Sequence, residues 1–211
     1  MKNKIGYSII ASDLVNIIPI IQKVNFVDFL HIDIMDGNFV PSLTIGPAYV
    51  NNLIDNLKNN NIDKFIDVHL MVNDPEKYID KLTNVDRIIF HIENNNTQNL
   101  INKIKNYKIH VGISISPNTN IDVLYPYVEN IDLVQIMTVE PGKCGQKIIP
   151  ECIQKINIIR QKYPNLDIQI DGGVNSNNLK ELVDEGANSF ISGSAILKET
   201  DAIKLFFRQT S

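Results

Sequence analysis

The chain has 211 residues, a length that fits one domain or two small ones. Its 20 basic and 24 acidic side chains give a formal charge of −4, and this balance, without any basic run, excludes an electrostatic nucleic-acid binder. Two cysteines exclude a disulfide framework, and no apolar run is long enough for a transmembrane helix. The N-terminal residues also lack the apolar centre of a signal peptide. We therefore expect one domain over residues 1–211, located in the cytoplasm, with no membrane or nucleic-acid partner.

Eight short β-rich segments recur along the chain. They begin, in order, at Ile5, Val27, Phe65, Arg87, Ile109, Ile131, Leu166 and Asn188. The stretches between them carry apolar residues at helical spacing, and strands that alternate with helices indicate a parallel sheet covered by helices. Eight units of about 26 residues favour an α/β fold of the (β/α)8 TIM-barrel type. The competing doubly wound sheet, in its dinucleotide-binding form, has a glycine-rich turn after its first strand, where this chain reads SIIASD.

The second predicted strand carries polar side chains on one face. Successive strand residues point to opposite faces, so His31, Asp33 and Met35 share one face and the Leu and Ile residues between them share the other. The Leu/Ile face is suited to packing under the helices. We therefore expect His31 and Asp33 to point into the barrel.

The third predicted strand repeats this pattern with Asp67, His69 and Met71, and the seventh ends at Asp171. Chemistry in such barrels lies at the C-terminal ends of the strands. Four residues are therefore expected to converge at one mouth: His31, Asp33, His69 and Asp171. Two imidazoles and two carboxylates suit a first-row divalent ion such as zinc, manganese, iron or cobalt. A single inward histidine is more often a hydrogen-bonded core residue, and we interpret His91 and Glu93 on the fourth strand in that way.

The last two strands are each followed by glycines and the start of a helix. Asp171-Gly172-Gly173 and Ser192-Gly193-Ser194 follow this design, which lets backbone N–H groups approach a phosphate closely. The loops after the seventh and eighth strands are also the usual phosphate position in barrels. A third glycine-containing loop follows the sixth strand, comprises Pro141-Gly142-Lys143-Cys144-Gly145-Gln146, and could close over the mouth.

Taken together, these motifs resemble the ribulose-phosphate 3-epimerase family. The resemblance covers almost the whole chain. It is carried by Ser8-Ile9-Ile10 with Ser12-Asp13, HIDIMDGNFVPSLTIGP from His31, DVHLMV from Asp67, QIMTVEPG from Gln135, DGGVN from Asp171 and SGSAI from Ser192. It implies a barrel of the ribulose-phosphate-binding type that interconverts D-ribulose 5-phosphate and D-xylulose 5-phosphate in the pentose phosphate pathway.

The resemblance also implies roles for individual residues. His31, Asp33, His69 and Asp171 match the family's ligands for one divalent metal ion (Zn, Mn, Fe or Co). Asp33 and Asp171 match its acid/base pair for proton transfer at C3 through an enediolate. The expected contacts with the sugar-phosphate substrate are Ser8, Met35, His69, Met71, Met137, Gly142, Lys143, Cys144, Gly145, Gly172, Gly173, Gly193 and Ser194. We also expect a homo-oligomer, although family members form different assemblies.

The chain departs from the family in the loop from Pro141 to Gln146, the lid loop, where Lys143 replaces a phenylalanine and Cys144 a glycine.

Three other functions compete with the epimerase. Allulose-6-phosphate 3-epimerase acts on a hexulose that is one hydroxymethylene longer, which the sequence discriminates poorly. Related barrel decarboxylases place a lysine two residues after the second-strand aspartate, where this chain has Met35. A non-catalytic sugar-phosphate-binding barrel would be favoured if either Asp33 or Asp171 were absent, and both are present.

Overall fold

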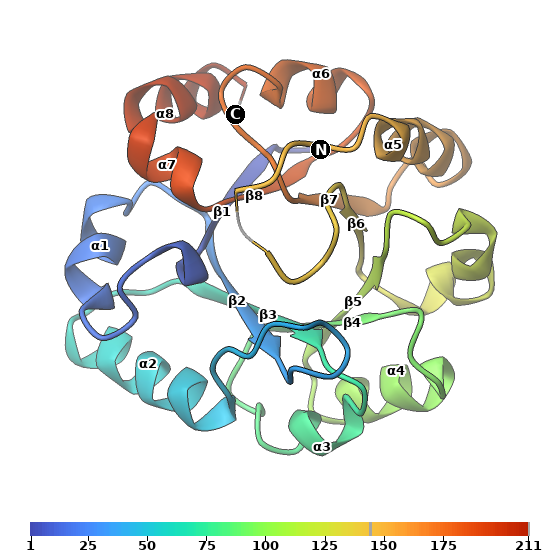
Figure 1. Ribbon diagram of the computed structural model, residues 1–211, viewed down its shortest axis with the longest axis horizontal. Coiled ribbons are helices and arrows are strands. Elements are labelled where there is room, and N and C mark those ends of the chain that lie inside the picture. The colour runs from blue at the N-terminus through green and yellow to red at the C-terminus, as the bar shows by residue number, and fades with distance from the viewer. Residues whose placement is uncertain (144, 211) are drawn as a thin grey trace.

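The computed structural model describes residues 1–143 and 145–210, and its eight parallel strands form a closed barrel (Figure 1). Neighbouring strands pair in sequence order, and the last strand closes on the first. The strands are β1 (Lys4–Ser8), β2 (Phe29–Met35), β3 (Phe65–Met71), β4 (Arg87–His91), β5 (His110–Ile115), β6 (Leu133–Met137), β7 (Asp167–Asp171) and β8 (Ser189–Ser192). The (β/α)8 barrel predicted from the sequence is confirmed.

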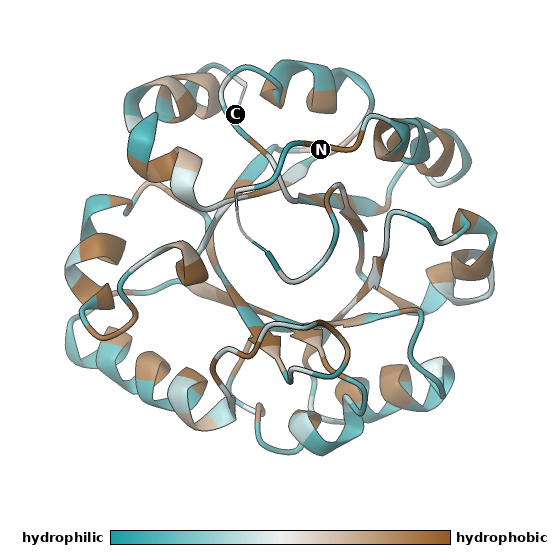
Figure 2. Ribbon diagram, in the orientation of Figure 1, coloured by the Kyte–Doolittle hydropathy of each residue, from teal (hydrophilic) through white to brown (hydrophobic). Residues whose placement is uncertain are grey.

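Helices surround the barrel, with their apolar sides toward the strands and their polar sides outward (Figure 2). The α-helices are α1 (Ile17–Lys23), α2 (Pro47–Asn59), α3 (Glu76–Ile79), α4 (Thr97–Asn106), α5 (Glu151–Lys162), α6 (Leu179–Asp184), α7 (Ser194–Lys198) and α8 (Thr200–Gln209). Two 3-10 helices are η1 (Ile9–Ala11) and η2 (Ile121–Asn130). Where an α-helix was expected between β5 and β6, η2 contains Pro126, whose missing N–H disfavours a continuous α-helix.

The two faces of each strand have different surroundings. On β2, Leu30, Ile32 and Ile34 belong to the apolar core between the strands and the helices. His31 and Asp33 alternate with them and are buried inside the barrel. The face assignment made from the period of two is therefore confirmed, and the barrel interior is polar at this level.

Apolar side chains fill the N-terminal end of the barrel interior. A Cβ atom at Gly6 would come within 2.0 Å of the Phe29 ring, and one at Gly112 within 2.6 Å of Ile89. Leu133 lies against Gly112 from the other side. Because this end is packed, the open space of the barrel lies at its C-terminal end.

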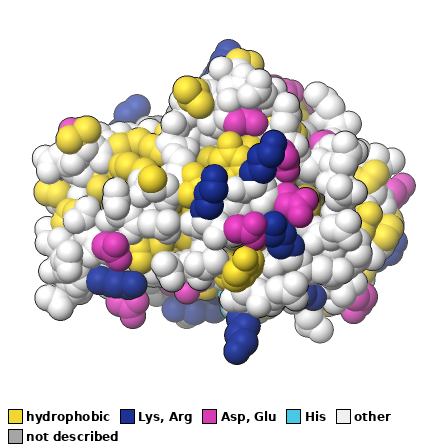
Figure 3. All heavy atoms as spheres, turned by 90° about the horizontal axis from the view of Figure 1, so that it is seen from below, with side chains coloured by type: hydrophobic (Ala, Val, Ile, Leu, Met, Phe, Trp, Pro, Cys, Tyr) yellow, Lys and Arg dark blue, Asp and Glu magenta, His cyan; other side chains and the backbone are white. Residues whose placement is uncertain are grey.

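The outer surface carries charges of both signs. On the face seen in Figure 3, lysine and arginine side chains are interspersed with aspartate and glutamate, without a continuous basic area. Within the described residues, no helix is long and apolar enough to cross a membrane.

Candidate active site

Four side chains from three strands meet at the mouth of the barrel. His31 and Asp33 come from β2, His69 from β3 and Asp171 from β7. Asp33 Oδ1 lies 3.2 Å from His31 Nε2 and 3.2 Å from His69 Nδ1. Asp171 Oδ2 lies 3.7 Å and 3.5 Å from the same two nitrogens. The structure therefore brings together the four residues that were expected to converge, with one ligand atom from each within 4.8 Å of the others.

The cluster has the donor atoms that a divalent metal ion requires. His31 Nε2 is buried and has no hydrogen-bond partner among the described residues, although it faces two carboxylates. Two imidazole nitrogens and two carboxylate oxygens suit a first-row divalent ion. The four residues therefore fit a metal ion and form a candidate metal centre.

Proximity of opposite charges sets the protonation of the cluster. Burial alone would raise the pKa of Asp33 and lower that of His31, but attraction to one another outweighs burial. The pKa of Asp33 is therefore lowered, and that of His31 is raised well above its ordinary value. In the same way, the contacts of Asp171 with the two histidines oppose the effect of burial and lower its pKa, and the contacts of His69 with the two carboxylates raise the pKa of His69. Both carboxylates are held in the ionised form that a cation needs.

A buried ion pair lies behind His31. Asp67 Oδ2 is 3.1 Å from His31 Nδ1, and Arg87 donates to the two Asp67 oxygens at 2.9 and 3.0 Å. Gln169 donates to Asp67 at 3.0 Å. Burial would raise the pKa of Asp67, but Arg87 and His31 hold it well below its usual range. Sequence analysis gave Asp67 no role. Its position two residues before His69, on the inward face of β3, could have indicated that it supports the site.

Gln135 of β6 is a second residue that sequence analysis left without a role. Its Nε2 lies 3.3 Å from Asp171 Oδ2 and 3.2 Å from both ring nitrogens of His69. An amide N–H donor beside Asp171 favours the ionised carboxylate. In the sequence, Gln135 stands two residues before Met137, on the same face of the strand, and this spacing could have indicated that its side chain faces the site.

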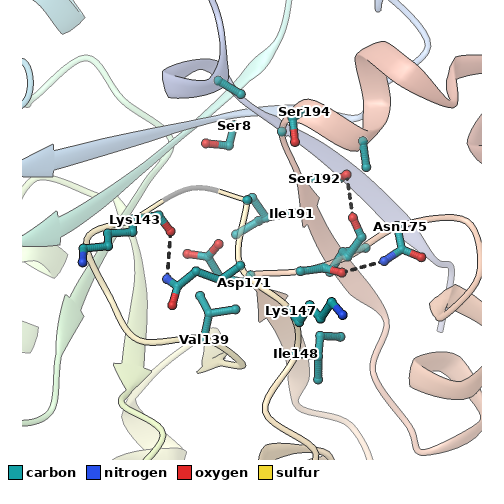
Figure 4. Close-up of a pocket in the computed structure, with 18 of the residues that line it drawn as sticks. Ser8, Val139, Lys143, Lys147, Ile148, Asp171, Asn175, Ile191, Ser192 and Ser194 are labelled. Atoms are coloured by element: carbon teal, nitrogen blue, oxygen red, sulfur yellow. Dashed lines mark hydrogen bonds between the residues drawn. The ribbon is translucent and has the colours of Figure 1, made fainter.

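A cavity of about 590 Å³ opens at this cluster (Figure 4). Asp33 and Asp171 both line it, and Ser8 Oγ donates to Asp33 Oδ2 at 3.0 Å. The thioethers of three buried methionines contribute apolar surface; they are Met35, Met71 and Met137. The cavity therefore joins two ionised carboxylates to a mainly apolar wall.

The loops after β6, β7 and β8 form the other end of the cavity. Gly172 has φ +112°, and a Cβ atom there would lie 2.4 Å from Val139 Cγ2. Gly173 has φ +70°, and its Cβ atom would lie 2.8 Å from the backbone nitrogen of Ile148. Neither position accepts a side chain, so the backbone itself faces the cavity. Gly193 and Ser194, after β8, line the same end.

Every predicted substrate contact that the structure describes lines this cavity except His69, which lies within the cluster. Cys144 falls outside the described residues. Lys147 and Lys198 also line the cavity and were not predicted. Lys143 lines it as well, although its side chain extends away from Asp171 (Figure 4).

The lid loop is tied to the loop after β2. Ser42 Oγ donates to the carbonyl oxygen of Gly142 at 2.5 Å. Gln146 Nε2 donates to the carbonyl oxygens of Glu140 and Lys143 at 2.7 and 2.9 Å. These bonds fix the loop over the mouth, where it crosses the barrel opening in Figure 1.

A parallel barrel with ionisable groups at the C-terminal ends of its strands and a glycine-lined cavity beside them defines a class of barrel enzymes. Solved structures of the same architecture include a KGPDC from Streptococcus mutans, with a TM-score of 0.75, 15% identity, and 99% and 98% of the two chains covered. A mutant tryptophan synthase alpha-subunit from Pyrococcus furiosus gives a TM-score of 0.74 at 13% identity, covering 100% and 97%. At these identities the likeness concerns the fold.

The sequence comparisons narrow the class to one family. The model of the ribulose-phosphate 3 epimerase family matches residues 4–197. The chain is 37% identical over 198 residues to the ribulose-phosphate 3-epimerase of Schizosaccharomyces pombe, covering 92% of this chain and 86% of the relative. It is 39% identical over 202 residues to the cytoplasmic isoform of the ribulose-phosphate 3-epimerase of Oryza sativa subsp. japonica, again covering 92% of this chain and 86% of the relative. The chain belongs to the ribulose-phosphate 3-epimerase family of isomerases.

Proposed function

We propose that this enzyme interconverts D-ribulose 5-phosphate and D-xylulose 5-phosphate by two-base proton transfer at C3, a step of the pentose phosphate pathway. The observation that carries the proposal is the pair of ionised carboxylates, Asp33 from β2 and Asp171 from β7, lining one cavity. The relatives from Schizosaccharomyces pombe and Oryza sativa are ribulose-phosphate 3-epimerases, which supports this substrate.

Inversion at a carbon needs a proton taken from one face and another delivered to the opposite face. Asp33 and Asp171 enter the cavity from β2 and β7, which β1 and β8 separate in the closed barrel, so each can serve a different face of the carbon without moving. The hydrogen at C3 lies next to the C2 ketone, so its removal gives an enediolate. Ser8, which donates to Asp33, orients that carboxylate toward the cavity.

A divalent ion would be held by His31, Asp33, His69 and Asp171. The chemistry that it supplies at such a site is Lewis-acid stabilisation of the negative charge that develops during deprotonation. The methionines keep water from the reacting carbons and offer soft contacts to a planar intermediate. Zinc, manganese, iron and cobalt all suit this donor set.

We assign the substrate phosphate to the glycine-lined end of the cavity. Backbone N–H groups at Gly172, Gly173 and Gly193 suit an anion, and Lys147 and Lys198 add positive charge there. Binding the phosphate orients the sugar, although the phosphate itself does not react. The cytoplasmic location and the homo-oligomer stay predictions, the first supported by the name of the Oryza sativa relative.

An assay on D-ribulose 5-phosphate beside D-allulose 6-phosphate tests the proposal. We expect turnover of the pentulose, abolished by exhaustive chelation and restored by Mn²⁺, Zn²⁺, Fe²⁺ or Co²⁺. Preference for the hexulose would favour allulose-6-phosphate 3-epimerase, the alternative substrate class. Binding of both sugars without turnover would favour a non-catalytic sugar-phosphate-binding barrel. Full activity in a preparation shown by elemental analysis to contain no metal would contradict the metal requirement.

A further inference from the structure

His69 has a second imidazole on the side away from the cluster. His69 Nε2 lies 3.0 Å from His91 Nε2, and the two rings stack with centroids 5.0 Å apart. His91 Nδ1 lies 3.0 Å from Glu93 Oε2. Three side chains thus form one line of contacts that starts at the candidate metal centre and ends at a carboxylate on the rim of the barrel.

Glu93 is held in place as a hydrogen-bond acceptor. Its Oε1 receives the backbone N–H of Ser116 at 2.9 Å and the hydroxyl of Thr119. Lys155 donates to the carbonyl oxygens of Ser116 and Thr119 at 3.1 and 2.8 Å, which fixes the loop that carries both donors. Burial would raise the pKa of Glu93, but bonds from His91, Thr119 and Ser116 outweigh it and lower the pKa to about 2.

The contacts from Glu93 through His91 to His69 favour one placement of the protons. An ionised Glu93 only accepts, so His91 carries its proton on Nδ1. His91 is fully buried, and a neutral ring satisfies both of its nitrogens, because Nδ1 then donates to Glu93 and Nε2 accepts from His69. His69 must then donate from Nε2 to His91, which leaves the lone pair of a neutral His69 on Nδ1. That nitrogen is the one that faces Asp33 and Asp171.

We propose that His91 and Glu93 are positioning residues that fix the tautomer and ring orientation of His69, so that its Nδ1 lone pair points into the candidate metal centre. The inference rests on the proposed metal-dependent function. His91 is fully buried, and the Phe39 ring packs against it with centroids 4.7 Å apart, which shields the ring from solvent. A carboxylate thus acts on His69 through an intervening imidazole.

A purely structural role for His91 requires its volume and its burial, not the direction of its hydrogen bonds. The two roles therefore differ in the effect expected when glutamine replaces Glu93. A glutamine amide fills the same space but offers His91 either its NH2 group or its carbonyl oxygen, so the tautomer of His91 is no longer fixed. Loss of such an outer partner typically costs about 10–100-fold in metal affinity.

Cobalt titration of chelated protein, followed by visible absorption, measures this effect without an activity assay. We expect Glu93→Gln to weaken Co²⁺ binding by about tenfold, and His91→Phe by about 10–100-fold with a shift of the cobalt bands. His110→Phe is the matched control, because His110 begins β5 with an exposed side chain, and it should bind Co²⁺ as the unmodified protein does.

The outcomes distinguish a failure of the positioning role of His91 and Glu93 from a failure of the proposed metal centre. If the unmodified protein binds Co²⁺ and Glu93→Gln, folded by circular dichroism, binds it within twofold and with the same bands, the positioning role is overturned and the metal centre stands. If the unmodified protein binds no Co²⁺, both proposals fall together. Should His91→Phe fail to fold, Glu93→Gln decides alone.

Histidine tautomers can also be observed directly. The chain has four histidines, so long-range ¹H–¹⁵N spectra of the zinc-loaded protein give four ring patterns that single substitutions assign. We expect the proton of His91 on Nδ1 and that of His69 on Nε2. A proton on Nε2 of His91 would overturn the proposal.

Discussion

The two ends of the cavity are built in different ways. At the reacting end, side chains from strands β2, β3 and β7 carry buried charges that balance one another at distances of 3.2–3.7 Å. At the other end, loops after β6, β7 and β8 present backbone at glycines, and the lysines that line it are exposed. One end depends on a rigid frame of strands, and the other on the local shape of loops.

This difference predicts which properties of the enzyme change when residues at each end of the cavity are substituted. Removing one member of a buried, compensated set leaves an uncompensated charge, which costs folding stability. Changing an exposed lysine on a loop alters attraction for an anion, and salt screens that attraction. Substitutions at the reacting end should therefore affect stability and turnover, whereas those at the loop end should affect substrate affinity.

The largest effect on stability is expected at Asp67. Asp67→Asn leaves the buried Arg87 guanidinium without its counter-charge, so the free energy of unfolding should fall by about 3–5 kcal/mol. Urea unfolding measures it. Asp184→Asn makes the same change in an exposed pair with Lys180 and should cost less than about 1 kcal/mol. Equal losses in the two variants would contradict the account of the reacting end.

The difference in folding stability between the unmodified protein and Asp67→Asn also depends on pH, with a defined sign. The pKa of Asp67 is lowered in the folded state, so its contribution to stability is present above its ordinary pKa of about 4 and is lost as the pH falls through the lower folded value. The stability gap between the unmodified protein and Asp67→Asn should stay constant from about pH 6 to pH 4, below the range in which His31 beside Asp67 titrates, and shrink only in stronger acid. A gap that closes between about pH 6 and pH 4 would contradict this.

Gly172 tests the shape of the loop end. Gly172→Ala forces a side chain against Val139 and into a left-handed conformation, with strain of about 1–3 kcal/mol. We expect the displaced loop to raise KM for the sugar phosphate by about tenfold, with a smaller change in kcat. Gly46→Ala is the control, since a Cβ atom there meets no atom of the described residues within 4 Å. Unchanged KM in Gly172→Ala would argue against a phosphate site at this loop.

The smallest effect is expected at Lys143. Lys143→Ala should raise KM by about threefold at low ionic strength and less at high salt, because an exposed charge contact is screened. Lys58→Ala removes an exposed lysine from the last turn of α2 and should leave KM unchanged. Identical kinetics of Lys143→Ala and the unmodified enzyme at low salt would show that the Lys143 side chain contacts solvent and not the substrate.

Much of the fold could be predicted because its signals are local. The period of two on β2 assigned His31 and Asp33 to the inside, and eight alternating strand and helix patterns indicated the barrel. The exception was η2, where the apolar spacing resembled an α-helix and Pro126 favoured 3-10 geometry instead.

The supporting contacts of the site were harder to predict, because they depend on register between distant strands. Gln169 and Asp67 are 102 residues apart in sequence and meet only when the barrel closes. His91 looked like an ordinary core histidine from the sequence alone. Its contact with His69 follows from the pairing of β3 with β4, in which His69 lies opposite Ile89, two residues before His91.

The most direct test of the two-base account is solvent-deuterium exchange at C3 by Asp33→Asn and Asp171→Asn. Metal content must be measured in each variant, because both carboxylates are also proposed ligands. We predict that each metal-replete variant loses epimerisation by several orders of magnitude, and that any remaining exchange is confined to one epimer, the opposite one in the two variants. Interconversion near the unmodified rate by either variant, or exchange from both epimers in a single variant, would contradict the account.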